Sequence, residues 1–340
     1  MTAIFHRPIP LTGAPWPADA LPLAGGPLFF SMVAEHRPGH PVRLVPVSEL
    51  GAPVRARLSA PRAPLLGLSL DRPRIMGVLN VTPDSFSDGG RFLARADAVA
   101  RARALIAAGA DILDIGGEST RPGAETVSVA DEIARVVPVI EALREEGIAA
   151  PISIDTRKAE VARAAITAGA DLLNDVSALE YDPASLDLVA GTGVSVCLMH
   201  AKGDPRTMQE APAYDDVLAE VHAYLAARVE ACLAAGVPRA RILVDPGIGF
   251  GKTAAHNLAL IDGLAAFHDL GCAVLLGVSR KRFIGAIGHA PSPADRMPGS
   301  IAAALQGLRR GAQVLRVHDV AETRQAALLW TAIEEGGAGG

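Results

Sequence analysis

The chain has 340 residues, half of them hydrophobic, and its 32 basic and 37 acidic side chains give a net charge of −5. This balance gives no support to nucleic-acid binding, which needs a basic surface. No apolar run approaches the roughly 18 residues of a membrane span, and the first residues lack the apolar core of a signal peptide. Three widely spaced cysteines, an odd number, are typical of a protein with reduced thiols. We therefore expect a cytoplasmic protein with neither nucleic acid nor membrane as a partner.

The first 64 residues differ in composition from the rest and contain about half of the chain's prolines. Two short β-like runs, Leu28–Val33 and Val42–Val47, lie between prolines, and helical periodicity is absent. Trp16, Phe29 and Phe30 are too apolar for a pure linker. The pattern predicts an appended lobe of extended segments over residues 1–64, with no role evident, followed by a main domain over residues 65–340.

From about Leu65 the chain repeats one unit: a short apolar strand, a polar loop, a helix and a glycine that ends it. The strand Ile75–Leu79 gives the clearest example, because it is apolar throughout and then turns polar from Asn80 to Gly90. The other expected strands are 112–115, 152–154, 172–173, 194–199, 242–244, 274–276 and 314–317. The expected helices are 95–108, 130–146, one that ends before Gly169, a short one around 186–190, then 216–235, 257–269, 300–310 and 320–333.

Eight such units favour a closed (β/α)8 TIM barrel over an open doubly wound sheet. In a closed barrel the carboxyl ends of all eight strands meet at one mouth, where active sites of this fold lie. Polar residues lie at or just after these predicted strand ends: Asn80, Thr120, Arg121, Asp155, Asn174, His200, Asp245, Lys281, Arg316 and His318.

Two chemical groups stand out among these polar residues. Asp155, Asn174 and Asp245 can accept and donate several hydrogen bonds to a flat heterocycle, although a lone aspartate at a strand end could merely cap the next helix. The cationic side chains of Arg121, Lys281, Arg316 and His318 suit a phosphorylated ligand, although each alone could be a solvated surface charge. His200 directly follows a strand, and we interpret it as a satisfied residue behind the site.

The segment DPGIGFGKT, residues 245–253, invites comparison with a phosphate-binding P-loop. That motif needs a glycine five residues before its Gly–Lys pair, and Pro246 occupies this position here. A nucleotide hydrolase is therefore disfavoured. The chain also lacks HExxH, paired CxxC and nucleophile-elbow motifs, which argues against a structural zinc site and acyl-enzyme chemistry. Any metal is better explained as Mg²⁺ held by few oxygen ligands and substrate phosphates, with Asn80 as the candidate ligand.

Eight motifs, in order along the chain, resemble those of the dihydropteroate synthase family. They are NVTPDSFSDGG (80–90), DIGGESTRPGA (114–124), SIDT (153–156), NDVS (174–177), LMH (198–200), DPGIGFGK (245–252), GVSRKRFIG (277–285) and RVHD (316–319). The resemblance implies a transferase of folate biosynthesis, a sulfonamide target and a homodimer. It would condense 6-hydroxymethyl-7,8-dihydropterin diphosphate with 4-aminobenzoate, giving 7,8-dihydropteroate and diphosphate.

The resemblance also assigns roles to matching positions. Asp155, Lys281, Arg121 and Asp245 would carry catalysis. The pterin ring would contact Asp155, Asn174, Asp245 and Lys281, with Met199 and Phe250 as walls. The diphosphate would contact Thr120, Arg121, Arg316 and His318, with Mg²⁺ near Asn80. The 4-aminobenzoate site would be bordered by Ser279, Lys281, Phe86 and Pro122 once the loops at 84–90 and 119–124 close as lids.

Diphosphate would leave in an ionising, SN1-like step, with cations stabilising the leaving oxygens and carboxylates stabilising the pterin cation. One alternative is a pterin- or folate-binding barrel without synthase activity, such as the module of corrinoid methyltransferases. The Ser279–Lys281 triplet and the STRP loop disfavour this alternative, because a methyl-transfer module has no diphosphate to hold. A degenerate paralogue is disfavoured by the intact motif set.

Overall fold

The computed structural model describes residues 4–11, 13, 15–81, 90–118, 126–203, 208 and 211–336. Eight parallel strands form a closed barrel in which the last strand pairs with the first, so that Leu315 lies beside Ile75. The predicted (β/α)8 barrel is thus confirmed. The strands are β6 Arg74–Asn80, β7 Ile112–Gly116, β8 Ile152–Asp155, β9 Leu172–Asp175, β10 Ser195–Met199, β11 Ile242–Asp245, β12 Ala273–Leu276 and β13 Val314–Val317.

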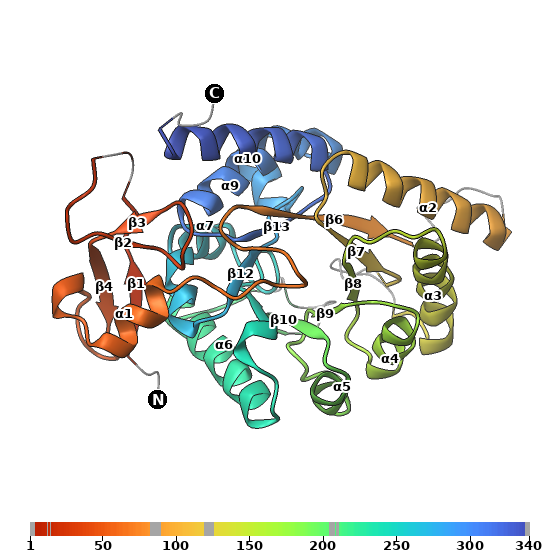
Figure 1. The fold of residues 1–340 in the computed structure, drawn as a ribbon, viewed down its shortest axis with the longest axis horizontal. Helices are drawn as coiled ribbons and strands as arrows, with labels where there is room; N and C mark the ends of the chain where they lie inside the picture. The colour runs from red at the N-terminus through yellow and green to blue at the C-terminus, as the bar shows by residue number, and fades with distance from the viewer. Residues whose placement is uncertain are drawn as a thin grey trace.

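The helices form a ring around these strands (Figure 1). Among the described helices, none is long and apolar enough to cross a membrane. The α-helices of the barrel are α2 Gly90–Ala107, α3 Val129–Glu145, α4 Ala159–Thr167, α5 Ser185–Thr192, α6 Val217–Ala234, α7 Ala254–Asp262, α8 Arg282–Ile287, α9 Met297–Arg309 and α10 Val320–Glu334. The 3-10 helices are η3 Arg239–Arg241, η4 Leu264–Leu270 and η5 Pro293–Arg296.

Three helices differ from the prediction. The helix expected over 257–269 is two elements, because α7 ends at Asp262 and the chain continues as η4, whose seven residues are all buried. At the break, a Cβ on Gly263 would lie 2.8 Å from the Leu218 methyl groups, so the glycine allows close contact with α6. The short helix α8 was not predicted, and α2 begins five residues before the predicted start.

The two faces of each strand enter different cores, as the two-residue period of a strand requires. Outward residues such as Leu113, Leu173 and Val244 pack with the helices in one large cluster. Inward residues form a separate small cluster in the barrel, made of Met76, Ile112, Leu172, Cys197, Leu243, Ala273, Leu275 and Val314. The barrel interior is therefore a packed core and not a pore.

The floor of the barrel is sealed by the segment ahead of β6. Leu65 and Leu68 form an isolated antiparallel bridge, and Leu65 and Leu70 join the inward cluster of the barrel. These leucines are 1% and 5% exposed, which makes them part of the core. Because the amino ends of the strands are closed in this way, the carboxyl ends form the open mouth.

Residues before the floor segment form the predicted extended lobe and one helix that was not predicted. A three-stranded antiparallel sheet has the order β1 Phe5–Pro8, β4 Met32–His36, β5 Arg43–Pro46, and a second sheet pairs β2 Leu21–Pro22 with β3 Phe29–Phe30. The 3-10 helix η1 Val47–Glu49 and the α-helix α1 Ala52–Ser59 follow. The prediction of no helix was wrong: α1 has Pro53 in its first turn and buries only Leu58, so its sequence lacks an apolar stripe that would have indicated a helix.

The lobe packs on the flank of the barrel at η4 (Figure 1). The ring of Phe5 stacks between His36 and His222, at centroid distances of 4.4 and 4.3 Å. Arg57 donates to the Asp269 carboxylate at 2.7 Å. Because Phe30 and Leu58 belong to the same apolar cluster as the barrel helices, the lobe and the barrel share a core, and the boundary at residue 64 stays a prediction.

Candidate active site at the barrel mouth

The strand period places the polar residues at the mouth. On several strands an inward apolar residue at the floor is followed two positions later by a polar one, as in Ile112 and Asp114, Leu243 and Asp245, or Val314 and Arg316. The predicted residues Asn80, Asp155, Met199 and Asp245 are the last residues of their strands, and Asn174 and Arg316 are the last but one. Ser279, Lys281 and His318 follow β12 and β13. The structure therefore brings these described residues together at the carboxyl end of the barrel.

Asp114 is the polar centre of the mouth, and the sequence reasoning did not assign it a role. It is fully buried, and its Oδ2 accepts a hydrogen bond from Arg316 Nε at 2.7 Å. Its Oδ1 accepts from Ser153 Oγ at 2.6 Å and from Asn174 Nδ2 at 3.3 Å. Asp114 thus orients Arg316 and Asn174 together. Its place two residues after the floor residue Ile112 was the signal that could have identified it.

Arg316 connects the cationic group to the hydrogen-bonding group among the polar residues of the mouth. Its Nη2 donates to Asp155 Oδ2 at 2.6 Å, in addition to the bond from Nε to Asp114. Burial alone would lower the pKa of Arg316, but the two carboxylates outweigh it and raise that pKa above its usual value. Arg316 therefore lies between the two groups: the residue predicted to contact the diphosphate also contacts two carboxylates of the mouth, as a guanidinium does in a site of low dielectric.

Asp155 and Asp245 are buried carboxylates whose pKa values are raised. Burial raises the pKa of Asp155 to about 7 against the opposing effect of Arg316. Burial also raises the pKa of Asp245, although Gly247 N donates to its Oδ1 at 2.7 Å and Lys281 opposes the shift. Asp155 Oδ1 is buried without a hydrogen-bond partner among the described residues. Such an acceptor is costly unless a ligand donates to it.

The loop after β12 presents Ser279 and Lys281 to the mouth. Arg280 between them has a positive φ of 58°, a strained conformation for a residue with a side chain. It turns away and forms an ion pair with Asp319 at 2.5 Å, and its backbone N–H donates to Ser300 Oγ at 2.8 Å. These contacts hold the turn, so that the residues on either side of Arg280 point in the opposite direction.

Two further contacts complete the described part of the mouth. Lys281 Nζ lies 4.2 Å from the centre of the Phe250 ring, at a distance typical of a cation–π contact. Ser279 Oγ lies 3.0 Å from His318 Nδ1 and also accepts the His318 backbone N–H at 3.2 Å. The loops after β11, β12 and β13 therefore support one another.

The prediction for His200 is confirmed. This histidine is buried behind the site, with Nδ1 2.9 Å from Lys252 Nζ, and burial lowers its pKa to about 3. Lys252 is the lysine of the P-loop-like segment. Its ammonium binds protein carbonyls in the interior, which agrees with the rejection of a phosphate-binding loop.

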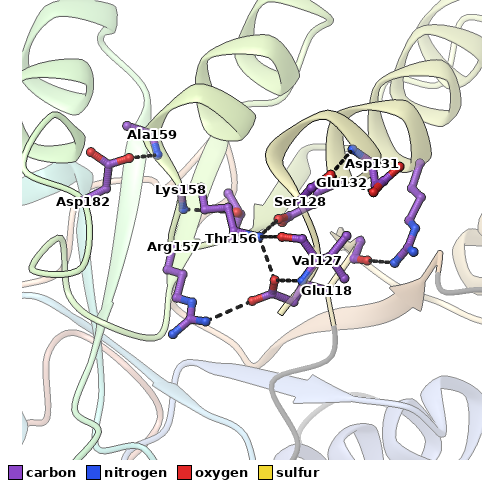
Figure 2. A network of polar contacts seen from close by, with 12 residues as sticks. Glu118, Val127, Ser128, Asp131, Glu132, Thr156, Arg157, Lys158, Ala159 and Asp182 are labelled. Carbon is purple, nitrogen blue, oxygen red and sulfur yellow. Dashed lines mark hydrogen bonds and ion pairs between the residues drawn. The ribbon is translucent and has the colours of Figure 1, made fainter. Parts of the chain in front are cut away.

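A buried network joins Glu118 and Val127 to Lys158 at the start of α4 (Figure 2). Lys158 Nζ donates to Glu118 Oε2, Glu132 Oε2 and the Val127 carbonyl, each at 2.6 Å. Glu118 Oε2 also accepts the Val127 backbone N–H at 2.8 Å. Lys158 follows Asp155 by three residues, so this network is tied to the strand that carries Asp155.

Four predicted site residues, Thr120, Arg121, Pro122 and Phe86, lie outside the described residues, as do nearly all of both predicted lid segments, 84–90 and 119–124. The described mouth has buried carboxylates, an amide, a lysine over an aromatic ring, and a guanidinium. This set can bind a flat heterocycle with several ring nitrogens that carries an anionic group. The fold and this arrangement define a barrel enzyme that binds such a ligand at the strand ends.

Comparisons with known proteins identify the family. The model of the pterin binding enzyme family matches residues 76–318. Dihydropteroate synthase of Escherichia coli K12 is 49% identical over 259 residues, 76% of this chain and 91% of that protein. The structure of Xanthomonas albilineans dihydropteroate synthase with 4-aminobenzoic acid is 51% identical and has a TM-score of 0.75, covering 81% of this chain and 98% of that one.

A third relative is a probable bifunctional folylpolyglutamate synthase/dihydropteroate synthase of Halobacterium salinarum, 45% identical over 310 residues. The match covers 90% of this chain and 37% of that longer protein, so it includes part of the lobe before residue 65. The chain belongs to the dihydropteroate synthases within the pterin-binding enzymes. It is a transferase with dihydropteroate synthase function.

Proposed function

We propose that the barrel mouth binds the pterin ring of 6-hydroxymethyl-7,8-dihydropterin diphosphate through Asp155, Asn174 and Asp245. The observation that carries this proposal is the pair of buried carboxylates, one of which has an acceptor oxygen without a partner among the described residues. The N–H groups of a pterin ring supply the donors that these oxygens lack. Met199, at the end of β10, and Phe250, in the loop after the neighbouring strand β11, would form the walls of the slot.

The diphosphate would lie toward Arg316 and His318, with Thr120 and Arg121 as further contacts. The two bonds from Arg316 to Asp114 and Asp155 use Nε and Nη2, and neither uses Nη1. Nη1 would then face the diphosphate while the carboxylates fix the plane of the guanidinium. A guanidinium held in this way needs little reorganisation when charge develops on the leaving oxygens.

The second substrate, 4-aminobenzoate, would lie beside Lys281 and Ser279, with Phe86 and Pro122 as the remaining contacts. The dihydropteroate synthase of Xanthomonas albilineans was solved with 4-aminobenzoic acid, which supports this class of substrate. Lys281 reaches both substrates in this arrangement, since its ammonium lies over Phe250 on the pterin side. Its positive charge would attract the carboxylate of 4-aminobenzoate.

The reaction would proceed by an SN1-like displacement. The bond between the methylene carbon and the diphosphate oxygen breaks with its electron pair going to diphosphate, and the pterin becomes a cation. Asp155 and Asp245 would stabilise this cation, because ionised carboxylates act strongly in a site of low dielectric. The amine of 4-aminobenzoate then forms the new carbon–nitrogen bond and releases a proton. Closed loops over the mouth would keep water from the cation, as the predicted lids imply.

The described residues fit Mg²⁺ at the end of β6. Gly116 has no side chain in the space between the Asn80 amide oxygen and the Asp155 carboxylate, where a Cβ would lie 3.7 and 3.8 Å from those oxygens. One amide oxygen is the kind of sparse protein ligand that Mg²⁺ uses when substrate phosphates complete its shell. When bound, the ion would neutralise charge on the diphosphate.

We also propose that the chain forms a homodimer and acts in the cytoplasm. Large apolar side chains are exposed on α7, α8 and α10, namely Leu258, Ile287, Leu328, Leu329 and Ile333. Helix α9 packs against all three of these helices, so the exposed side chains belong to one side of the barrel, and a second copy would cover them. Sedimentation of the wild type and of Leu328→Glu tests the dimer; a wild-type monomer would contradict it. The three buried free cysteines agree with a reducing compartment.

Diphosphate release tests the proposed reaction. The wild type should release diphosphate from the pterin diphosphate only when 4-aminobenzoate is added, and no release with both substrates would contradict the proposal.

Arg121→Ala should weaken binding of the pterin diphosphate by roughly tenfold or more, because one charge-assisted contact to phosphate is lost. Binding of the bare pterin alcohol should change far less. Equal losses of affinity for the pterin diphosphate and the pterin alcohol would show that Arg121 does not contact the leaving group.

A further inference from the structure

The glycine-rich loop after β11, residues 245–253, ends in a buried lysine that the proposed reaction does not use. Lys252 is only 3% exposed. Its ammonium lies 2.9 Å from His200 Nδ1 and donates to three backbone carbonyls, of His200 at 3.2 Å, Gly247 at 2.9 Å and Phe250 at 3.0 Å. One side chain therefore joins the end of β10 to two points of the loop.

All four of these contacts are with neutral groups, which is unusual for a buried lysine. Burial lowers the pKa of Lys252 to about 7, and the nearby carboxylate of Asp245 offsets this shift only in part. Burying this ammonium group therefore costs free energy of folding, and in return the group donates hydrogen bonds to several acceptors of the loop. That cost is expected where the geometry of the loop matters more than stability.

The loop itself has little freedom to take another path. Gly247 and Gly251 have φ values of 68° and 62°, and a Cβ on either would overlap the carbonyl oxygen of His200 or Lys202. Tyr214 adds a further hydrogen bond from its hydroxyl to the Gly251 carbonyl at 2.8 Å. The loop is therefore pressed against the segment after β10, and Lys252 is at the centre of that contact.

Two residues of the pterin side depend directly on this loop. Phe250, whose carbonyl Lys252 binds, places its ring under the Lys281 ammonium. Gly247, whose carbonyl Lys252 also binds, donates its N–H to Asp245 Oδ1. Arg316 and His318, the proposed contacts of the diphosphate, are not among the hydrogen-bond partners of Lys252. The same is true of Asp114, Asp155 and Ser279, which bind these two residues.

We infer that Lys252 is a positioning residue for pterin binding, which holds Phe250 and Gly247 in place so that the ring slot is formed before substrate arrives. The inference rests on the proposed placement of the pterin ring between Asp245 and Phe250. It predicts a selective defect: loss of the ammonium impairs recognition of the ring and leaves recognition of diphosphate intact.

The variant Lys252→Met tests this by keeping the length of the side chain and removing its donors. Calorimetric titration with the bare pterin alcohol should show a Kd about tenfold higher than in the wild type, or about 1.4 kcal/mol. The Kd for inorganic diphosphate with Mg²⁺ should stay within about twofold. Equal Kd values for the pterin alcohol in both proteins, or parallel losses for both ligands, would overturn the inference.

Arg144→Met is a matched control at the opposite end of the barrel. Arg144 also binds three backbone carbonyls, of Ile148, Ala150 and Gly169, but far from the mouth. This variant should melt at a lower temperature and bind both ligands like the wild type. A wild type that fails to bind the pterin alcohol would instead refute the proposed function, which keeps the two failures distinct.

A double-mutant cycle with Phe250→Ala tests the route of the effect. If Lys252 acts through the loop, the two losses in pterin affinity should be clearly less than additive, whereas full additivity would overturn the inference.

Tyr214→Phe covers the case in which Lys252→Met does not fold. It removes the Tyr214–Gly251 bond and should raise the Kd for the pterin alcohol by about two- to threefold without changing that for diphosphate. An unchanged pterin Kd in that variant would contradict the inference.

Discussion

Two pairs of aspartates lie at opposite ends of the barrel, and their surroundings differ. At the floor, Asp111 Oδ2 accepts the Ile75 backbone N–H at 2.7 Å and forms an ion pair with Arg324. Asp171 Oδ2 likewise accepts the Ile152 N–H at 2.8 Å and is paired with Arg144 at 2.6 Å. Each floor aspartate thus accepts a backbone N–H group near the start of a strand and forms an ion pair with an arginine that is partly exposed to solvent.

At the mouth, Asp155 and Asp245 are buried more deeply, and Asp155 has fewer partners among the described residues. Asp155 shares Arg316 with Asp114, and one of its oxygens has no partner among the described residues. The pKa values of Asp155 and Asp245 are raised by burial. The same residue type therefore serves stability where its hydrogen bonds are complete and ligand binding where they are not.

The largest effect should come from Asp155→Ala. Removing a carboxylate that stabilises developing charge should lower kcat/KM by about 10²–10³-fold. The melting temperature should change little, because the variant also removes a buried acceptor without a partner. Steady-state kinetics and calorimetry measure the two quantities. A large loss of stability with near-normal turnover would show that Asp155 serves stability as the floor aspartates do, and would contradict the distinction between the two ends of the barrel.

A smaller effect is expected for Lys281→Ala. The ammonium lies between the proposed sites of the pterin and of 4-aminobenzoate, so KM should rise for both substrates, by roughly tenfold each. Varying one substrate at a saturating level of the other separates the two values. Near-normal kinetics, or a change confined to one substrate, would reject this placement of Lys281.

The raised pKa of Asp155 predicts a pH dependence of stability. In the folded protein this pKa is about 7, well above its usual value, so between about pH 4 and 7 the folded state binds more protons than the unfolded state. The contribution of Asp155 to the free energy of unfolding is therefore fully present below about pH 4 and is lost as the pH rises to about 7.

Chemical denaturation at pH 5 and pH 8, without ligand, measures this contribution. The wild type should lose more stability between the two values than Asp155→Asn, which cannot titrate. Asp245 and the other groups titrate in both proteins, so the difference reports Asp155. Parallel changes in the two proteins would contradict the raised pKa.

The smallest catalytic effect should come from the floor variant Asp171→Ala. It leaves the Ile152 N–H without an acceptor and Arg144 without its ion pair, which should cost about 1–3 kcal/mol of unfolding free energy. The melting temperature should fall by several degrees while kcat/KM stays within about twofold. A loss of turnover comparable to that of Asp155→Ala would show that the two ends are not functionally distinct.

The barrel could be predicted from the sequence because its signal is local. Short apolar runs, glycines after helices and polar residues at strand ends repeat along the chain, and each depends only on neighbouring residues. The two-residue period then places Asp155, Asn174 and Asp245 inside the mouth once the strands are known. The break at Gly263 and helix α8 could not be predicted in this way, because packing against α6 and the loop after β12 decides them.

The partners inside the mouth were beyond sequence reasoning for a different reason. Arg316 was predicted to lie at the mouth, but the sequence contains no sign that it would bind Asp114 and Asp155, which lie on β7 and β8. The role of Lys252 was also hidden, since its acceptors are backbone carbonyls that any residue could supply. Pairings across strands depend on distances of a few ångströms that spacing along a chain does not specify.

The segment that joins the lobe to the barrel lies at the closed floor, at the end opposite to the active-site mouth. Residues 65–70 close the floor of the barrel, and the preceding lobe contacts its flank at η4, just ahead of the amino end of β12. A tag, a surface linker or a whole second enzyme joined ahead of the lobe would therefore leave the entrance for substrates unobstructed.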